Sequence, residues 1–281
     1  MLWISIAVFV IVAGMLAYAT VRGRRRDDAG IDKREVRWGD PFIAVAGVFI
    51  PFLILAGVFV VSLREMNGLS ADARGSRLTI QVIGHDWWWE ARYPNGAVTA
   101  NEIHIPVGEP VEVELTTADV IHSFWVPELQ VKTDQIPGRI NRQWLEADRA
   151  GIYRGQCAEF CGLQHANMVF YVIADDDFDA WVEREAQAAS VTASEGEDIF
   201  MSSSCAGCHA IRGTEAEAVL GPDLTHVASR TTLAGVAATT RANMLRFVRD
   251  AQDLKPGVTM PPAELSAEEL DAVVDYLMGL E

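Results

Sequence analysis

Residues 157–168 read Cys157-Ala158-Glu159-Phe160-Cys161-Gly162-Leu163-Gln164-His165-Ala166-Asn167-Met168, and this stretch is the most informative part of the sequence. It offers two thiols, an imidazole and a thioether on one short segment. Sulfur ligands mixed with imidazole suit copper better than hard cations. Two cysteines separated by three residues can both point inward, and each can bridge a pair of metal ions. One further imidazole is needed upstream, and His122 in residues 119–124 is well placed to supply it.

The pattern resembles the binuclear copper loop of cytochrome c oxidase subunit II, in which two copper ions share one delocalised electron. The resemblance implies that both cysteines bridge the two ions. It assigns His122 and Met168 to one copper, and His165 and the backbone carbonyl of Glu159 to the other. The same family uses the carboxylate of this glutamate to reach a magnesium ion at the interface with subunit I. The alternative is a disulfide beside an unrelated His and Met, which requires five side-chain positions to coincide by accident.

The other two cysteines of the chain lie in Cys205-Ala206-Gly207-Cys208-His209. C-x-x-C-H is the attachment motif of c-type haem, in which Cys205 and Cys208 bond the haem covalently and His209 becomes an axial ligand. Met260, on the proline-rich loop 255–262, is the predicted second axial ligand, as in class I cytochromes c. The other methionines of this region lie in or at the end of helical patterns, where packing explains them: Met201, Met244 and Met278.

Two long apolar runs occupy the first 63 residues, from Leu2 to Val21 and from Phe42 to Leu63. Each is long enough to cross a hydrocarbon core of roughly 30 Å as a helix. Pro51 lies inside the second run and is expected to kink it. The loop between the runs is rich in arginine and lysine over residues 22–37, so the positive-inside rule places it in the cytoplasm. Both chain termini, and everything after the second run, then face the exterior.

The first run has a second interpretation as a cleaved signal peptide, because Ala17-Tyr18-Ala19 resembles a cleavage site. A signal peptide carries positive charge before its apolar core, and here the basic cluster follows the run instead. A retained membrane helix is therefore favoured. Glu65, just past the second run, loosely matches a residue near a proton-channel entrance in the family, and a charged helix end is the alternative.

The net charge of −16 comes from the exterior part, because residues 1–63 contain more basic than acidic side chains. An acidic exterior domain argues against a nucleic-acid partner and favours a basic protein donor attracted over long range. Ordinary solubility is the alternative explanation.

Short alternating segments between Leu78 and Ala174 predict β-strands, for example over residues 78–83, 102–107 and 111–115. Gly, Pro and Asn separate them, which is typical of a Greek-key barrel or sandwich. The resemblance names this part a cupredoxin fold over residues 77–185. In such a fold the loops at one end supply the copper ligands, so His122 and the cysteine loop can converge there.

Two further segments match the subunit II family. Residues 84–90, Gly-His-Asp-Trp-Trp-Trp-Glu, resemble its aromatic patch, which implies that Trp87 receives electrons from cytochrome c with Trp88 behind it. Side chains alternate along a strand, so at least one of three consecutive tryptophans should be exposed; burial of all three by neighbouring loops is the alternative.

Residues 132–139 resemble the family's loop near the copper site, with Asp134 as a docking carboxylate and Arg139 at the subunit interface. Each of these two side chains is equally explained as a solvated loop charge.

The last part of the chain resembles a class I cytochrome c over residues 194–281, joined to the copper domain by a linker of small and polar residues at 186–193. Ser194 with Glu197 predicts a capping box at the start of a helix that carries the haem motif. Ser266 with Glu269 predicts a second box, followed by apolar residues at helical spacing. Residues 221–224 are similar to the loop that packs on the histidine side of the haem.

The sequence therefore predicts a multi-domain chain: a transmembrane helical hairpin over residues 1–68, with helices about 2–21 and 42–63, then an all-β cupredoxin domain, a linker and an all-α cytochrome c domain. The resemblance implies a bacterial inner-membrane protein, multi-pass, with its copper and haem domains outside. It implies that electrons enter from cytochrome c and pass through one covalent haem c and two coppers to subunit I of a haem–copper oxidase. It also implies that the chain contacts other oxidase subunits and membrane lipid.

Three other functions fit parts of this pattern. A quinol oxidase subunit would share the anchor and the barrel but would lack copper ligands, which are all present here. A copper-delivery protein would need neither Met168 nor a fused haem. A membrane-anchored electron carrier without an oxidase partner would keep both centres, and the sequence alone leaves that function open.

Overall fold

The computed structural model describes residues 2–23, 39, 41–69, 76–189 and 194–281, and for residues 23 and 65–69 it describes the backbone alone. The chain divides into two compact units, Met1–Ala71 and Asp72–Glu281. Most of the predicted cytoplasmic loop and residues 190–193 of the predicted linker lie outside the described residues, as does the side chain of Glu65.

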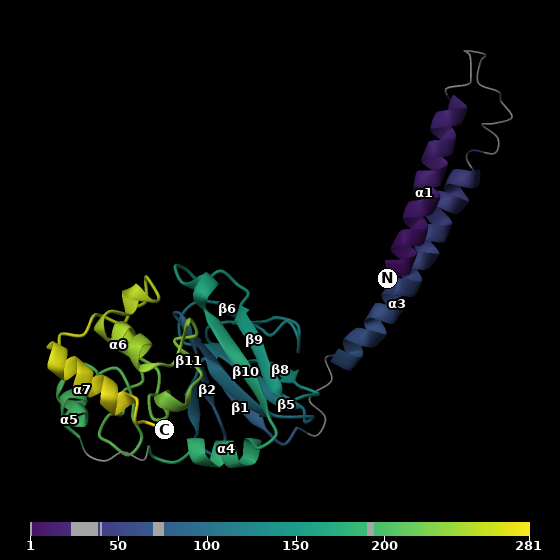
Figure 1. Ribbon diagram of the computed structural model, residues 1–281. Coiled ribbons are helices and arrows are strands. Elements are labelled where there is room, and N and C mark those ends of the chain that lie inside the picture. The colour runs from purple at the N-terminus through teal and green to yellow at the C-terminus, as the bar shows by residue number, and fades with distance from the viewer. Residues whose placement is uncertain (1, 24–38, 40, 70–75, 190–193) are drawn as a thin grey trace. The chain divides into compact units, whose positions relative to one another are not determined.

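The first unit consists of two long apolar helical segments (Figure 1). Helix α1 spans Leu2–Gly23, and a π-helical segment at Ile43–Phe49 leads directly into α3 at Ile50–Leu69. Both segments are long and apolar enough to cross a membrane, with mean hydropathies of 2.4 and 2.7 over Leu2–Arg22 and Ile43–Arg64. The wide π turns end where Pro51, which has no N–H group to donate, enters the first turn of α3. The two predicted apolar helices are confirmed.

The second unit begins with a sandwich of two five-stranded sheets. The first sheet has the order β3-β2-β1-β5-β8 and the second has the order β4-β10-β9-β6-β7. β1 pairs parallel with β5, and β4 pairs parallel with β10, while the other neighbours in the two sheets are antiparallel. The strands are β1 Thr79–His85, β2 Trp88–Arg92, β3 Val98–Ala100, β4 Glu102–Pro106, β5 Val111–Thr117, β6 His122–Trp125, β7 Thr133–Gln135, β8 Asn141–Leu145, β9 Gly151–Cys157 and β10 Val169–Asp175.

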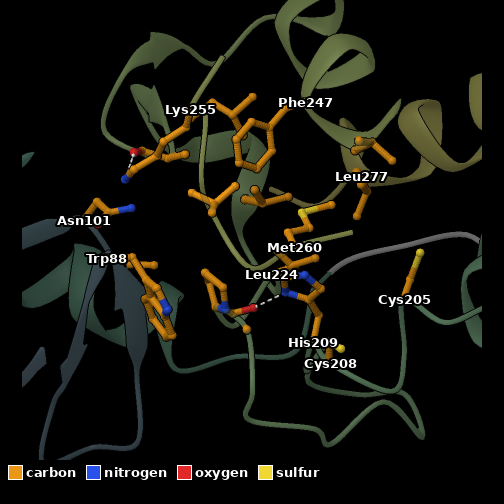
Figure 2. A pocket seen from close by; sticks show the side chains of 18 of the residues that line it. Trp88, Asn101, Cys205, Cys208, His209, Leu224, Phe247, Lys255, Met260 and Leu277 are labelled. Atoms are coloured by element: carbon orange, nitrogen blue, oxygen red, sulfur yellow. Dashed lines mark hydrogen bonds between the residues drawn. The ribbon is translucent and has the colours of Figure 1, made fainter. Parts of the chain in front are cut away.

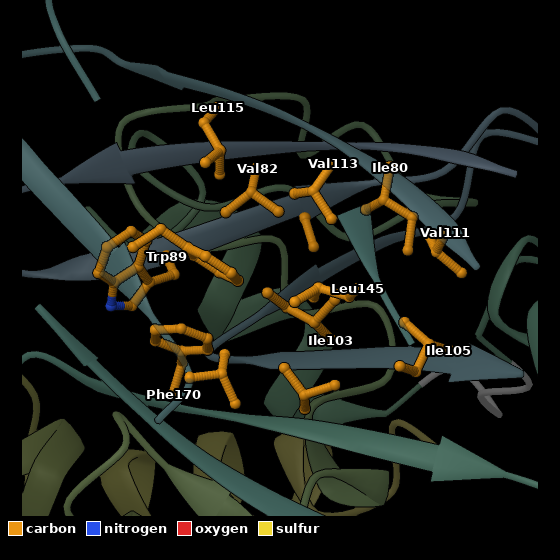
Figure 3. Close-up of a cluster of buried hydrophobic side chains, with 14 of the residues drawn as sticks. Ile80, Val82, Trp89, Ile103, Ile105, Val111, Val113, Leu115, Leu145 and Phe170 are labelled. Carbon is orange, nitrogen blue, oxygen red and sulfur yellow. The ribbon is translucent and has the colours of Figure 1, made fainter. Parts of the chain in front are cut away.

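The sandwich core follows from the alternation in the sequence. Every second side chain of β5, beginning with Val111, is buried, and the intervening ones are less buried. Figure 3 shows apolar side chains of both sheets meeting in the space between them, with Trp89 and Phe170 at one end. The rings of these two residues lie 4.9 Å apart. Helix α4, Phe178–Glu185, packs its first residue, Phe178, into the same core. The predicted β-sandwich is confirmed.

Helices dominate the rest of the second unit. They are α5 Glu195–Ser202, α6 Arg241–Arg249 and α7 Ala267–Leu277, with a two-stranded ribbon of β11 Thr232–Leu233 and β12 Ala237–Ala238 between the first two. Ser266 and Glu269 form the predicted capping box at the start of α7. At α5 the structure shows one half of the predicted box: the Ser194 side chain accepts a hydrogen bond from the Glu197 amide. The predicted helical fold of this domain is confirmed.

The haem motif does not lie on a helix, which corrects the prediction from sequence. Helix α5 ends at Ser202, and Cys205–His209 form a turn in which the amides of Cys208 and His209 donate to the Cys205 carbonyl at 3.1 and 3.0 Å. Ser202 ends helix α5, and Ser203 and Ser204 lie between the helix and the haem motif. The Ser202 and Ser203 hydroxyls donate to backbone carbonyls of the last helical turn. Such local bonds compete with helix propagation, so the helix stops before the motif.

Gly196 sets the distance between α5 and α7. A Cβ atom at this position would lie 2.1 Å from the Ala272 carbonyl oxygen of α7. Gly196→Ala should therefore push the two helices apart and lower the free energy of unfolding of the haem domain by about 1–3 kcal/mol. Thermal unfolding of the full chain, followed by the circular dichroism of its helices, measures this effect. An unchanged midpoint would show that α7 moves away at no cost.

Candidate functional site

The predicted copper ligands gather at one end of the second sheet. His122 is the first residue of β6, and Cys157 is the last residue of the neighbouring strand β9. Cys161 lies in the loop that follows, His165 begins a single 3-10 turn, and Met168 directly precedes β10. Two backbone hydrogen bonds hold the base of this loop: the Cys157 amide donates to the Met168 carbonyl at 3.0 Å, and the Ala158 amide to the Ser123 carbonyl at 2.9 Å.

The side chains of this loop point their donor atoms at one another. The two cysteine sulfurs are 3.8 Å apart, and Cys161 Sγ lies 3.6 Å from His165 Nδ1 and 3.7 Å from Met168 Sδ. Cys157 Sγ lies 3.9 Å from His122 Nδ1 and 3.1 Å from the Glu159 carbonyl oxygen. All six predicted copper ligands are therefore brought together.

The sulfur separation suits a shared metal and not a disulfide. A disulfide bond is about 2.05 Å long, and all four cysteines of the chain are free. With metal–sulfur bonds of about 2.3 Å, as in zinc sites, two sulfurs on one tetrahedral ion lie about 3.8 Å apart. The donor set is two thiols, two imidazoles, a thioether and a carbonyl; His122, the two cysteines and Met168 are buried, and the sulfur and imidazole donors fit copper.

The Asp119 carboxylate orients the His122 ring through the ring nitrogen that faces away from the cysteines. Its Oδ1 atom lies 2.7 Å from His122 Nε2, so the ring donates there and leaves Nδ1 facing the cysteines. The carboxylate is itself held by the amides of Val120 and Asp86, each at 2.6 Å. Burial lowers the pKa of His122, but the hydrogen bonds to Asp119 and Cys157 outweigh it and raise the pKa to about 9.

The thiols differ in acidity before a metal binds. The hydrogen bond that Cys157 accepts from Cys161 lowers the pKa of Cys157 to about 3. The same pairing raises the pKa of Cys161, because a second negative charge would face the first at 3.8 Å. Only a cation placed between the two sulfurs stabilises both as thiolates, which is the state that binds copper.

The haem motif lies on an apolar cavity of about 360 Å³ (Figure 2). Cys205, Cys208, His209 and Met260 all line it. The remaining walls are mainly apolar side chains of the helical domain, among them Phe200, Leu224, Val227, Phe247, Val273 and Leu277. An apolar cavity with a few polar groups is the environment that holds a large planar cofactor.

His209 is held in the orientation that an iron ligand needs. Its Nδ1 atom donates to the Pro222 carbonyl at 2.8 Å, which leaves Nε2 free to face the cavity. Burial lowers the pKa of His209, so the ring is neutral and able to coordinate. Gly221 packs against this ring so closely that a Cβ atom there would lie 2.5 Å from its Cε1 atom. Figure 2 shows Met260 beside His209 on the same cavity.

Comparison with known proteins matches both halves of the second unit. Residues 96–174 match the family model of the cytochrome c oxidase subunit II periplasmic domain, and residues 193–281 match that of cytochrome c. Cytochrome c oxidase subunit 2 of Alkalihalophilus pseudofirmus is 37% identical over 291 residues, covering 99% of this chain and 83% of that protein. The chain belongs to the cytochrome c oxidase subunit 2 family.

A second relative agrees with this membership. Cytochrome c oxidase subunit 2 of Bacillus sp. is 33% identical, covering 90% of this chain and 75% of that protein. The solved periplasmic domain of subunit II of cytochrome oxidase of Bradyrhizobium japonicum shares 34% identity, with a TM-score of 0.39 over 41% of this chain and 96% of that one.

The three consecutive tryptophans are less exposed to solvent than the predicted aromatic patch requires. Trp87 sits in the β1–β2 turn and is 9% exposed, and Trp89 is fully buried. Trp88 is half-buried, stacks on His85 with ring centroids 4.1 Å apart, and lines the haem cavity together with Trp87. Trp87 is therefore not exposed as expected, because its indole packs against Gly162 and donates to the Cys161 carbonyl of the copper loop, whereas Trp88 keeps part of its surface exposed.

The remaining candidate residues have surface or structural positions. Asp134 and Glu159 are about half-exposed and flank Lys132, whose ammonium lies 3.7 and 3.8 Å from their carboxylates, and Arg139 is exposed. The three other described histidines each have a hydrogen-bond partner: His85 with Glu90, His104 with Asp175 and His226 with the Gln187 carbonyl.

Two residues at the site were given no role from the sequence. Asp119 lies three residues before His122, and that spacing is a usable signal for an orienting carboxylate. Lys255 lies in the loop that also carries Met260, but its contacts are with residues far away in the sequence. Local spacing therefore could not have revealed what it binds.

The hydrogen bond from His122 to Asp119 provides a test of the copper site. Asp119→Asn removes the negative charge and the orienting acceptor, and should weaken copper binding by about 10–100-fold. Competition with a copper chelator on the full chain measures the affinity. Asp134→Asn, which removes an exposed carboxylate outside the ligand set, is the matched control and should bind copper like the parent chain. Equal affinity of the two variants would exclude an orienting role for Asp119.

Proposed function

We propose that this chain takes electrons from an exterior donor through a covalent haem c to a dicopper centre and passes them to subunit I of a terminal oxidase. The chain belongs to the cytochrome c oxidase subunit 2 family and matches the subunit II periplasmic domain and cytochrome c models, which supports work in association with other oxidase subunits. The observation that carries the proposal is the convergence of six donor atoms around two shared sulfurs.

Cys157 and Cys161 would each bridge two copper ions. His122 and Met168 would complete one ion, and His165 with the Glu159 carbonyl the other. The distances of 3.1 to 3.9 Å from the two sulfurs to these donor atoms support the convergence of this set. When bound, such a centre and the haem each carry one electron at a time. The chain contributes burial, ligand identity and orientation, so that little rearrangement accompanies each transfer.

In the haem domain, Cys205 and Cys208 would form the covalent links, with His209 and Met260 as axial ligands. The cavity that these four residues line supports the assignment, as does the Pro222 carbonyl that orients the His209 ring. A thioether ligand such as Met260 favours the reduced iron and raises the potential.

Trp88 and Trp87 connect the two centres in this proposal. Both line the haem cavity, and the Trp87 indole donates to the Cys161 carbonyl at 2.8 Å. The electron would therefore pass within the chain from the cavity to the copper loop through this turn. The burial of Trp87 fits a role toward the chain's own haem rather than toward a separate protein.

The chain is membrane-anchored by its two apolar helices. We further propose that the anchor lies in a bacterial inner membrane among lipid, with both termini and the two redox domains on the periplasmic side. A cytochrome c or similar basic protein would serve as the donor, attracted by the acidic net charge of −16. The half-exposed Glu159 carboxylate would bind a magnesium ion at the interface with subunit I.

Cys161→Ser tests the bridging assignment. A hydroxyl bridges soft copper poorly, so the copper content should fall from two ions to one or none and the mixed-valence signal should be lost. Metal analysis and electron paramagnetic resonance of the purified chain measure these changes, while the haem spectrum serves as the internal control. A variant that kept a delocalised signal would contradict the proposal.

Met260→Ala tests the axial ligand of the haem. The sulfur-to-iron absorption band should disappear and the haem potential should fall, because a thioether stabilises the reduced iron. Met244→Ala is the matched control, since this methionine also lines the cavity but lies buried on α6. Loss of the band in the control alone would move the axial role to Met244.

A further inference from the structure

The haem domain and the sandwich contact each other through buried polar groups. The Glu102 carboxylate, on a residue 3% exposed on β4, accepts from the amides and hydroxyls of Thr231 and Thr232 at 2.6 to 3.2 Å. At the edge of the interface, the Arg212 guanidinium makes an exposed bond to the Gly96 carbonyl at 2.7 Å. These directional bonds fix one orientation of the two domains more strictly than an apolar contact would.

Lys255 makes the most unusual of these contacts. The residue is 2% exposed, and its ammonium donates to the Trp87 carbonyl at 2.7 Å and to the Ala234 carbonyl at 3.1 Å. The first acceptor belongs to the sandwich and the second to the haem domain. Burying an ammonium is costly, and burial lowers the pKa of Lys255 to about 8. Its two carbonyl partners therefore determine where the side chain can lie.

The position of Lys255 in the chain links it to both candidate centres. It begins the loop that leads to Met260, and its own amide donates to the Ala251 carbonyl at 2.9 Å. The residue that it binds across the interface, Trp87, donates its indole N–H to the Cys161 carbonyl. One buried side chain thus joins the loop of the predicted haem ligand to the turn that contacts the copper loop.

We propose that Lys255 is a positioning residue for electron transfer between the haem and the dicopper centre, acting by clamping the Met260 loop to the Trp87 turn. This inference rests on the proposed function. The transfer moves one electron, which oxidises the haem iron and reduces the dicopper centre, and it forms and breaks no covalent bond. Lys255 contributes geometry to this step and binds neither metal.

The close approach of the two backbones around this contact supports a clamp. Gly235, one residue after the acceptor Ala234, has a φ of +74°, and a Cβ atom there would lie 2.5 Å from the Val169 carbonyl oxygen of β10. Gly257 similarly lies against Leu163 of the copper loop, and the Gln164 side chain donates to the Pro256 carbonyl. Both sides of Lys255 are therefore in contact with the sandwich.

The first test measures docking without following electron transfer. Hydrogen exchange of the full chain, purified with both cofactors bound, should show slow exchange at Thr231 and Thr232, whose amides donate to Glu102. In Lys255→Leu these amides should exchange about tenfold faster, because the buried ammonium bonds that hold the interface are lost. Arg241→Leu removes one positive charge from the exposed surface of the same domain and should exchange like the parent.

The second test uses the loaded chain. After rapid photochemical reduction of the haem, electron arrival at copper should be several-fold slower in Lys255→Leu than in Arg241→Leu. The haem and copper spectra should match those of the parent. If Lys255→Leu loses either cofactor, Lys255→Gln, which keeps a polar group, takes its place in both tests.

Each outcome decides the inference. Faster exchange together with slower transfer and intact spectra supports the clamp. Parental exchange or parental transfer in the Lys255 variant would overturn it. Loss of the Met260 absorption band in both Lys255→Leu and Lys255→Gln would also overturn it, since Lys255 would then act only inside its own domain. If the parent chain itself transfers no electron to copper, the proposed function fails, whereas the exchange comparison still decides whether Lys255 holds the domains together.

Discussion

The approach of two cysteine sulfurs to 3.8 Å is the constraint on which the rest of the copper end depends. Two thiolates at this distance repel, so the metal-free loop keeps one of them protonated. The protein holds them together by anchoring the loop between two rigid strands, β9 and β10, through the backbone bond from Cys157 to Met168. The sandwich core below, with Trp89 against Phe170, keeps these strands in place. The β-fold thus supplies the rigidity that a soft, buried donor set needs.

The haem domain must also hold its predicted ligands in a fixed orientation, and it does so in a different way. An apolar cavity lies among the helices and loops of this domain, and the predicted ligand His209 is held by one backbone carbonyl and one glycine contact. The two domains then share a wall, because Trp87 and Trp88 of the sandwich line the cavity beside residues of the helical domain. Fusing the domains in one chain raises their effective concentration, so the polar contacts between them need only select an orientation and not supply affinity.

Most of the architecture was accessible from local patterns. The apolar runs, the alternation at residues 111–115 and the capping box at Ser266 each depend on neighbours along the chain, and the structure has them as expected. The two errors have different causes, one a contact distant in sequence and the other a set of local serine bonds. Trp87 was expected to be exposed, but the copper loop, far along the chain, packs on its indole at Cys161 and Gly162. The haem motif was placed on a helix that instead ends at Ser202, where serine hydroxyls bond the backbone.

The sequence by itself determined the donor chemistry, because thiol, imidazole and thioether groups at fixed spacing leave few metals that suit them. It also determined the order of domains and the two apolar helices, since hydrophobic length and periodicity are local properties. Only the tertiary structure decided that His122 meets the cysteines in the orientation set by Asp119, and that Lys255 joins the two redox domains. Such contacts depend on which strands and loops become neighbours in space, and no short-range pattern encodes that.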